Sequence, residues 1–422
     1  MGSRSFPPSC SIRSGNSACR PCCSASAFEG RPRFRSEPVV VGADEQASLY
    51  RAAEEMAAAW NELCLLCAER PELVSGFLGL SEVQQALWWS SAPHWHGIAR
   101  ADVFLTGGGP RICELNCDTP SGEAEAVLLN RAAARRGLSD PNAALEDRFC
   151  AMIEHLGRSV RAGTPGPLSI GIVYPTEIAE DLSMVLLYRR WFEKRGFRVT
   201  LGSPFNLCAL PGRRAGLFGT PCDVFVRHYK TDWWSERSPA WADAPAVPDP
   251  EPLSEQLGII LGSVLRGTSA VVNPFGAVVP QNKRAMALFW ERLDLFSGYS
   301  RAAIRQYLPE TVRLESLSQE RLLAEREDWV LKSDYGCEGD EVVIGKGTEP
   351  DDWKDCLNAA VPGRWVAQRY FRAAPGPDGT VANHGVFLVA GRACGLYTRI
   401  SEGPTDRYAL SAPVLVRPGD SP

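Results

Sequence analysis

The sequence predicts a mixed fold of the α/β (α+β) class, with an α/β domain and a separate module of short antiparallel strands. An apolar run at 168–174 is followed by an amphipathic helical pattern and, after Gly196, by a second apolar run at 197–201. This strand–helix–strand order is typical of a parallel sheet. The last third of the chain carries short apolar runs between glycine-rich turns, which indicates an antiparallel sheet.

The remaining elements follow from periodicity and turn residues. A helix is expected from about Asp44, because apolar residues recur at spacings of four and three. This stripe consists of Leu49, Ala53, Met56, Trp60, Leu63 and Cys67. Residues 99–106 and 111–118 form a predicted hairpin around the glycines at 107–109. Further helices are expected at 81–89, 123–136, 257–265 and 282–295, and further strands at 222–227, 270–273, 329–333, 341–344, 364–370, 383–389 and 395–400.

Four regions are expected along the chain. Residues 1–42 are rich in Ser, Arg and Cys and are expected to be a disordered tail. Residues 43–165 hold helices and the hairpin, and residues 166–280 hold the α/β region. Residues 281–422 contain the antiparallel module.

Composition excludes several classes of protein. The chain has 422 residues, 45% hydrophobic and 23% charged, which is ordinary for a globular protein of about two to three domains. A net charge of −5 argues against a general nucleic-acid binder, which needs a basic face. No run approaches the roughly 20 apolar residues of a membrane-spanning helix. We therefore expect neither nucleic acid nor a membrane among the partners.

The 14 cysteines are scattered and do not form a disulfide framework, which favours a reducing, cytoplasmic location. Cys64 and Cys67 fall within a helical pattern and are expected to be buried core thiols. Cys19, Cys22 and Cys23 form half of a zinc-ribbon pattern, without a second half nearby. A cysteine-based metal or redox protein is therefore a weaker alternative.

The predicted hairpin carries the strongest polar cluster. Alternate side chains of a strand share a face, so Arg100 and Asp102 point one way on the first strand, and Glu114, Asn116 and Asp118 on the second. Pairing of the strands can bring Asp102 beside Glu114 and Asn116. Two carboxylates and an amide oxygen suit Mg²⁺. The alternative is a solvated hairpin face with a local salt bridge.

Two lysines are candidates for contacts to phosphate. Lys332 ends an apolar strand that leads into a turn bounded by Gly336 and Gly339, whose backbone N–H groups can approach phosphate oxygens. Lys283 opens a predicted helix, where an anion can bind. The chain contains no Walker loop. Ordinary hairpins also carry Lys and Gly, so the pattern alone is weak.

Two later strands carry further candidates. The strand ending at Gln368, followed by Arg369, Tyr370 and Phe371, can offer backbone groups to an adenine edge, although a core strand would look the same. Arg399 lies on an apolar strand, and an inward Arg can hold phosphate oxygens, although an isolated Arg is usually at the surface. The motifs H-E-x-x-H, G-x-S-x-G and G-x-G-x-x-G do not occur.

Taken in order, these segments resemble the synthetase domain of glutathionylspermidine synthase and its stand-alone relatives, a circularly permuted branch of the ATP-grasp ligases. The resemblance runs from about Ala43 to Val416. It is carried by R-x-D followed by E-x-N in Glu-Leu-Asn-Cys-Asp-Thr-Pro-Ser-Gly, and by Val-Leu-Lys-Ser-Asp-Tyr-Gly-Cys-Glu-Gly. The E-x-N motif precedes Lys283 and Lys332, as the permuted branch requires.

The resemblance implies a fold, cofactors and site residues. The fold would be a pre-ATP-grasp α/β domain with a substrate region at 166–280, plus an ATP-grasp-like antiparallel module that binds the nucleotide at 281–422. Asp102, Glu114 and Asn116 would hold Mg²⁺, as two ions. Arg100 and Arg399 would be catalytic, steadying an acyl-phosphate and a tetrahedral intermediate. ATP would be contacted by Lys283, Lys332, Gly336, Gly339, Gln368, Arg369, Tyr370 and Phe371.

The activity implied by the resemblance is an ATP- and Mg²⁺-dependent carboxylate–amine ligase that forms an amide bond through an acyl-phosphate and releases ADP. Its partners would be a small-molecule or peptide carboxylate and an amine. The alternative is a catalytically inactive ATP-grasp-like protein that binds nucleotide. Cys337 motivates this alternative, because the family commonly has Arg in that turn.

Overall fold

The structure is a computed structural model that describes residues 27–28, 31–161, 163, 165–176, 182–235, 253–336, 342–360, 363–403, 405 and 408–419. The cysteines of the first 25 residues lie outside the described residues. So do Cys337 and Gly339 of the predicted turn.

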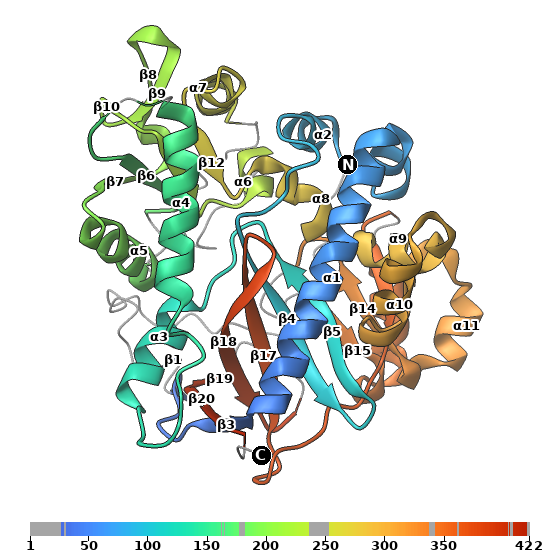
Figure 1. Ribbon diagram of the computed structural model, residues 1–422. Helices are drawn as coiled ribbons and strands as arrows, with labels where there is room; N and C mark the ends of the chain where they lie inside the picture. Colours follow the sequence, from blue (N-terminus) through green and yellow to red (C-terminus); the bar gives the residue numbers. More distant parts are fainter. Residues whose placement is uncertain are drawn as a thin grey trace, which may run out of the picture.

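A five-stranded antiparallel sheet forms the centre of the fold (Figure 1). Its order is β19-β18-β17-β4-β5. Its strands are β4 (Ile98–Thr106), β5 (Gly109–Asn116), β17 (Val381–Val389), β18 (Arg392–Ser401) and β19 (Leu410–Ala412). The predicted hairpin is confirmed as β4 and β5. Because β17 pairs with β4, residues from distant parts of the chain share one sheet.

The central sheet has one apolar and one polar face. Helix α1 (Ala43–Glu69) crosses the apolar face (Figure 1). There Met56 and Trp60 of the predicted stripe pack in one buried cluster with Ala101 and Val103 of β4. Side chains alternate along a strand, so the residues between these point to the other face. That face is left open to a cleft.

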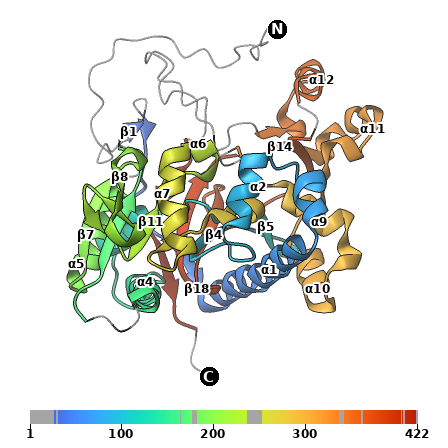
Figure 2. The same ribbon diagram turned by 90° about the horizontal axis from the view of Figure 1, so that it is seen from above.

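A four-stranded parallel sheet of order β12-β11-β6-β7 lies beside the central sheet (Figures 1 and 2). Its strands are β6 (Ser169–Val173), β7 (Arg198–Gly202), β11 (Val224–Arg227) and β12 (Ala270–Val272), and its helices are α4 (Leu145–Arg161), α5 (Leu182–Lys194) and α7 (Ser254–Leu265). The predicted parallel unit is confirmed as β6, α5 and β7. Phe149 and Trp191 of these helices share a buried cluster with Phe387 and Tyr397 of the central sheet.

A second antiparallel sheet has the order β13-β16-β14-β15. Its strands are β13 (Thr311–Arg313), β14 (Trp329–Ser333), β15 (Val342–Ile344) and β16 (Trp365–Arg369), and its outer helices are α11 (Gln319–Ala324) and α12 (Pro350–Ala359) (Figure 2). Trp329 and Leu331 of β14 pack with Trp353 of α12. Val330 and Lys332 alternate with them and therefore face the cleft.

The ordered chain begins earlier than the sequence analysis expected. Phe34 bridges Ser411 at the free edge of β19, and β3 (Val39–Gly42) pairs in parallel with β20 (Val414–Arg417). These residues were expected to lie in a disordered tail. Their order depends on backbone groups supplied by the far end of the chain, which local composition does not encode.

The predicted helix at 282–295 is also different in the structure. Lys283 caps α9 (Arg284–Glu291), so the helix begins where it was predicted, but it ends at Glu291 instead of at 295. Asn282, whose backbone is extended, separates α9 from α8 (Val278–Gln281). The Asn282 side chain accepts a hydrogen bond from the backbone N–H of Arg284 at 2.8 Å, in competition with a continuous helix. The break places Lys283 at the start of α9.

The remaining elements connect these layers. They are β2 (Arg31–Pro32), α2 (Glu82–Trp89), α3 (Glu123–Ala132), β8 (Leu207–Leu210), β9 (Arg214–Leu217), β10 (Thr220–Pro221), α6 (Thr231–Ser235) and α10 (Gly298–Tyr307). Cys64 and Cys67 are buried in the core, as predicted. In the part of the chain that the structure describes, no helix combines the length and apolar character needed to cross a bilayer.

Candidate active site

A cleft of about 600 Å³ lies where the three sheets meet. Its floor is the polar face of the central sheet, and one wall is the inner face of the second antiparallel sheet. Residues 119–122, which follow β5, and residues 230–232 of the α/β region also line it. Lys332, Gln368 and Arg399 line it together with the polar residues of the hairpin, whereas Lys283 and Gly336 are not among its lining residues.

The three predicted magnesium ligands lie together on the floor of the cleft. Asp102 and Glu114 are direct partners in the β4–β5 ladder, and Asn116 lies one alternate position further along β5. The Asn116 Nδ2 group donates to Glu114 Oε1 at 3.2 Å. The juxtaposition predicted from strand alternation is therefore confirmed. Asp102 is buried and pairs locally with Arg100, and all three side chains line the cleft.

Arg100 holds Asp102 and the loop after β5 in place. Its Nε and Nη2 atoms donate to the two carboxylate oxygens of Asp102 at 2.7 and 3.1 Å. Its Nη1 donates to the carbonyl of Ser121 at 2.6 Å. Burial favours the neutral guanidine, but the charge and hydrogen bonds of Asp102 outweigh it and raise the pKa of Arg100. Arg100 therefore remains a fixed positive charge in the cleft.

Both predicted lysines reach this cluster from other elements. Lys332 Nζ donates to the carbonyl of Cys113 at 3.1 Å, at the β-bulge of β5. Lys283 Nζ lies 3.7 Å from Glu114 Oε2 and donates to the carbonyl of Gly336. Both lysines are buried. Two ammonium groups thus lie against the strand that carries Glu114 and Asn116.

The charge balance of the cluster shows in the pKa of Glu114. Burial alone would raise this pKa, because a carboxylate loses hydration. Lys283, Lys332 and Arg100 act in the opposite direction and hold the pKa of Glu114 below its ordinary value. The carboxylate is therefore ionised at neutral pH and is available to a cation.

The oxygen donors suit Mg²⁺ chemically. A hard divalent cation takes carboxylate and amide oxygens, and each carboxylate oxygen has more than one acceptor position. In the structure Glu114 shares its oxygens only with Asn116 and the distant Lys283, among its described contacts. Asp102 is more strongly engaged, because Arg100 contacts both of its oxygens. The residues present therefore fit the ion. The carboxylate of Glu114 is more accessible to it than that of Asp102.

Part of the lining of the cleft is apolar. Val330 and Ile344 line it from the second antiparallel sheet, together with Tyr370 and Phe371. The Phe371 ring meets Phe104 of β4 edge-on, with 5.6 Å between centroids. Flat apolar walls of this kind suit an aromatic base.

Gln368 and Arg369 are placed differently from each other. Gln368 is buried at the cleft and donates through Nε2 to Thr311 Oγ1 at 3.0 Å. The Arg369 guanidinium lies on the other face, 4.0 Å from the Trp329 ring centroid, and pairs with Glu325 at 3.1 Å. Arg369 can therefore contribute to the cleft through its backbone rather than through its charge.

Arg399 lines the cleft, and the Gly336 carbonyl accepts a hydrogen bond from Lys283. Arg399 faces Asn383 across the β17–β18 pair. Asn383 in turn donates to Asp102 Oδ2 at 3.5 Å. Gly339 cannot be placed, because it lies outside the described residues.

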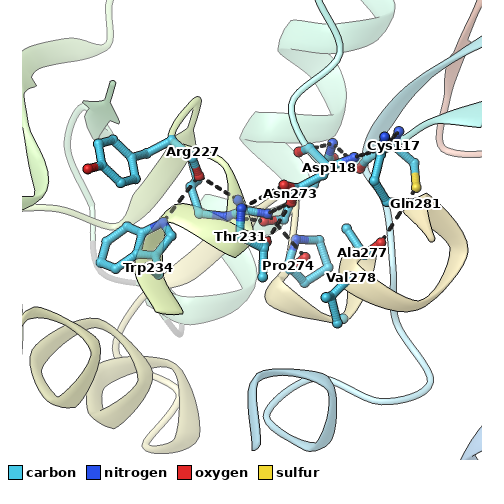
Figure 3. Close-up of polar contacts among 12 residues, drawn as sticks. Cys117, Asp118, Arg227, Thr231, Trp234, Asn273, Pro274, Ala277, Val278 and Gln281 are labelled. Atoms are coloured by element: carbon cyan, nitrogen blue, oxygen red, sulfur yellow. Dashed lines mark hydrogen bonds and ion pairs between the residues drawn. The ribbon is translucent and has the colours of Figure 1, made fainter. Parts of the chain in front are cut away.

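The structure reveals a buried polar network that sequence reasoning missed (Figure 3). Asp118 accepts hydrogen bonds from Arg227 and Thr231, and Asn273 and Gln281 hold the backbone of the same segment. In the sequence, Asp118 stood out only as one more polar residue after Asn116. Its partners lie in unrelated segments, so no local spacing could have identified them.

No protein-family profile and no curated protein sequence matches the chain. Among solved structures, the chain is similar to a glutathione synthetase-like effector from Globodera pallida, with a TM-score of 0.52 and 10% identity over 90% of this chain and 89% of that one. A second structure, provisionally named as a gamma-glutamylcysteine synthetase from Methylobacillus flagellatus, aligns with a TM-score of 0.45 and 11% identity over 89% and 87%. The first likeness shows that the chain shares its mixed α/β fold with that effector.

Proposed function

We propose that the protein is an ATP- and Mg²⁺-dependent ligase that joins a carboxylate to an amine through an acyl-phosphate. One observation carries this proposal: Lys283 and Lys332 converge, from distant segments, on the strand that bears Glu114 and Asn116. A nucleotide triphosphate needs both cations and a divalent ion around its oxygens, and this cleft offers groups suited to each.

The residues of the cleft suit the charge changes of such a reaction. A carboxylate oxygen attacks the γ-phosphorus of ATP, and the bond to the bridging oxygen breaks to release ADP. The amine nitrogen then attacks the acyl carbon and loses a proton, and phosphate leaves. Both steps build negative charge on oxygen atoms. Lys283, Lys332, Arg100 and Arg399 would neutralise it.

Asp102, Glu114 and Asn116 would hold Mg²⁺, as one or two ions, and the bound ion would supply further charge neutralisation for phosphate oxygens. The adenine would lie at the apolar end between Val330, Ile344 and the segment around Phe371. The second substrate would then lie at the far end, beside the loops at 119–122 and 230–232. An acyl-phosphate hydrolyses in water, and the walls on three sides of this cleft would limit that loss.

The similarity in fold supports a ligase of this general type. The narrower proposal, a glutathionylspermidine synthase-like activity, rests on the sequence motifs that contain Glu114 and Lys332. We therefore expect a peptide or small-molecule carboxylate as one substrate and an amine as the other. Glutathione and spermidine are the first pair to test.

The test is a product screen. Purified protein is incubated with ATP, Mg²⁺, a pool of peptide carboxylates including glutathione, and a pool of amines including spermidine. Release of ADP and a product mass equal to acid plus amine minus water are expected. Glu114→Ala is expected to lower the rate at least 100-fold, because two ammonium groups lose their counter-charge and the ion loses a ligand. Asp294→Asn, at a surface carboxylate, is the matched control.

The alternative activity has its own signature. A nucleotide-binding protein without ligase activity would bind Mg²⁺ and a non-hydrolysable ATP analogue in calorimetry, yet release no ADP with any pair in the pool. Unchanged activity in Glu114→Ala would instead contradict the assignment of the ion site.

A further inference from the structure

The Asp118 carboxylate joins two walls of the cleft that belong to different parts of the fold. Asp118 follows Asn116, the last residue of β5, by two positions. Its Oδ2 accepts from the backbone N–H of Thr231 at 2.7 Å, and its Oδ1 accepts from the Thr231 hydroxyl at 2.6 Å. The Asp118 carboxylate therefore accepts from both hydrogen-bond donors of Thr231, its backbone N–H and its hydroxyl (Figure 3).

A buried arginine completes this contact. Arg227 Nη2 donates to Asp118 Oδ1 at 2.5 Å, and the Arg227 side chain is fully buried. The same guanidinium donates through Nη1 to the carbonyl of Tyr229 at 2.7 Å. Trp234 Nε1 donates to that carbonyl at 3.1 Å. Residues 229–232, the loop that leads into the first residues of α6, are thus tied to one ion pair through Tyr229 and Thr231.

The other side of Asp118 is anchored to the scaffold. Its backbone N–H donates to Gln281 Oε1 at 3.0 Å, and its carbonyl accepts from Asn273 Nδ2 at 3.2 Å. Asn273 also accepts from the backbone N–H of Ile98 at 2.9 Å, at the start of β4. Displacement of the segment after β5 would therefore break its contacts to Gln281 of α8 and to Asn273, which follows β12.

The loop held in this way faces the cleft. Lys230 and Asp232 flank Thr231, and both line the cleft. A positive and a negative side chain are therefore presented there by one short loop. Their positions depend on Thr231, whose own side chain is buried.

We propose that Asp118 is a positioning residue that fixes the loop at 229–232 against the end of β5 and so couples the ion and nucleotide site to the wall where the second substrate binds. This inference rests on the proposed function for the identity of the two sites. The contact between Asp118 and the loop stands independently of it. A buried carboxylate with an arginine and a hydroxyl donor forms a short, directional link, because charge-assisted hydrogen bonds are stronger than neutral ones.

The test uses Thr231, because Asp118→Asn would leave the Arg227 charge buried without a partner and could unfold the protein. Thr231→Val keeps the shape of the side chain and removes the hydroxyl donor, whereas Thr231→Ser keeps the donor. Hydrogen–deuterium exchange of the full chain is measured over 227–234, with and without Mg²⁺ and the ATP analogue AMP-PNP. Thermal unfolding of each variant checks that the fold is intact.

In Thr231→Val we expect amide exchange in 227–234 to increase at least ten-fold, and in Thr231→Ser less than two-fold. In the unaltered protein, Mg²⁺ and AMP-PNP should slow exchange in this segment, and Thr231→Val should abolish that effect. With the substrates found by the product screen, Thr231→Val should raise KM for the amine or carboxylate at least ten-fold while KM for ATP changes less than two-fold. If Thr231 only stabilised the fold, Thr231→Val would change both KM values to a similar extent.

Two results would overturn the inference. Equal exchange in Thr231→Val and Thr231→Ser would show that Asp118 does not fix the loop. An equal rise in both KM values would show that the loop is not specific to the second substrate. Failure of the unaltered protein to bind AMP-PNP would contradict the proposed function and the coupling, whereas the exchange comparison without nucleotide would still report on the Asp118 link.

Discussion

The ammonium group of Lys332 donates a hydrogen bond of 3.1 Å to the backbone carbonyl of Cys113, which lies 219 residues earlier in the chain. Cys113 occupies the bulge of β5, between Glu114 and the rest of the strand. A bulge re-aims neighbouring groups and leaves a carbonyl without its usual partner in the ladder. The contact brings a charge from one sheet to the edge of the oxygen cluster on another.

Removal of this charge should weaken nucleotide binding. In Lys332→Met the apolar stem remains packed, but the ammonium group is lost. We expect KM for ATP to rise at least ten-fold, which corresponds to about 1.4 kcal/mol. Initial rates of ADP release at varied ATP measure this effect. Lys354→Met, at an exposed position of α12, provides the comparison and should behave like the unaltered protein.

The acid limit of activity should depend on Lys283. The pKa of Glu114 lies below its ordinary value because Lys283, Lys332 and Arg100 outweigh burial. Its ionised form therefore contributes stability above an unfolded pKa of about 4.5, and this contribution is lost as the pH falls through the folded pKa. In Lys283→Met the pKa of Glu114 should rise, so Mg²⁺-dependent activity should fall at a higher pH. Profiles of kcat/KM from pH 4.5 to 8 that superimpose for both proteins would refute this charge balance.

Glu123 should make stability decrease as the pH rises. Its carboxylate is fully buried, and burial raises its pKa to about 7 against the smaller opposing effects of its own backbone N–H, His228 and Tyr188. The folded protein then keeps a proton that the unfolded chain releases above about pH 4.5, so stability is lost between these two values. Glu123→Gln removes this dependence. The free energy of unfolding of the unaltered protein, relative to Glu123→Gln, should fall by roughly 3 kcal/mol from pH 4 to pH 8.

Chemical denaturation at several pH values checks this prediction, and Glu327→Gln, at a surface carboxylate, is the control. A constant difference between the unaltered protein and Glu123→Gln across the range would show that Glu123 keeps an ordinary pKa.

Gly122 should tolerate no side chain. Its φ is +102°, and a Cβ atom there would lie 2.8 Å from the ring of Tyr397 on β18. The neighbouring Ser121 carbonyl accepts from Arg100, so a shift at Gly122 would also disturb the cleft. We expect Gly122→Ala to cost roughly 1–3 kcal/mol of stability and to reduce activity. Gly137→Ala shares the positive φ but meets no atom within 4 Å, so it separates backbone strain from the clash.

The sequence by itself determined the elements in which one local period dominates. The stripe from Leu49 to Cys67 predicted α1, because a helix that covers a sheet repeats its apolar residues at spacings of three and four. Alternation along β4 and β5 likewise predicted that Asp102, Glu114 and Asn116 share a face, since the period of a strand fixes the direction of each side chain. These predictions needed no information from elsewhere in the chain.

Only the tertiary structure decided which segments meet. The order of residues 31–42 and the link from Asp118 to Thr231 each depend on partners distant in sequence. Backbone and side-chain polar groups must find hydrogen bonds when they are buried, but composition and spacing do not say which segment provides them. The ion pairs that Arg369 makes beside Trp329 likewise depend on carboxylates from another segment of the chain. Local periodicity therefore placed the chemical groups on their strands, and packing of distant strands determined which of them share a cleft.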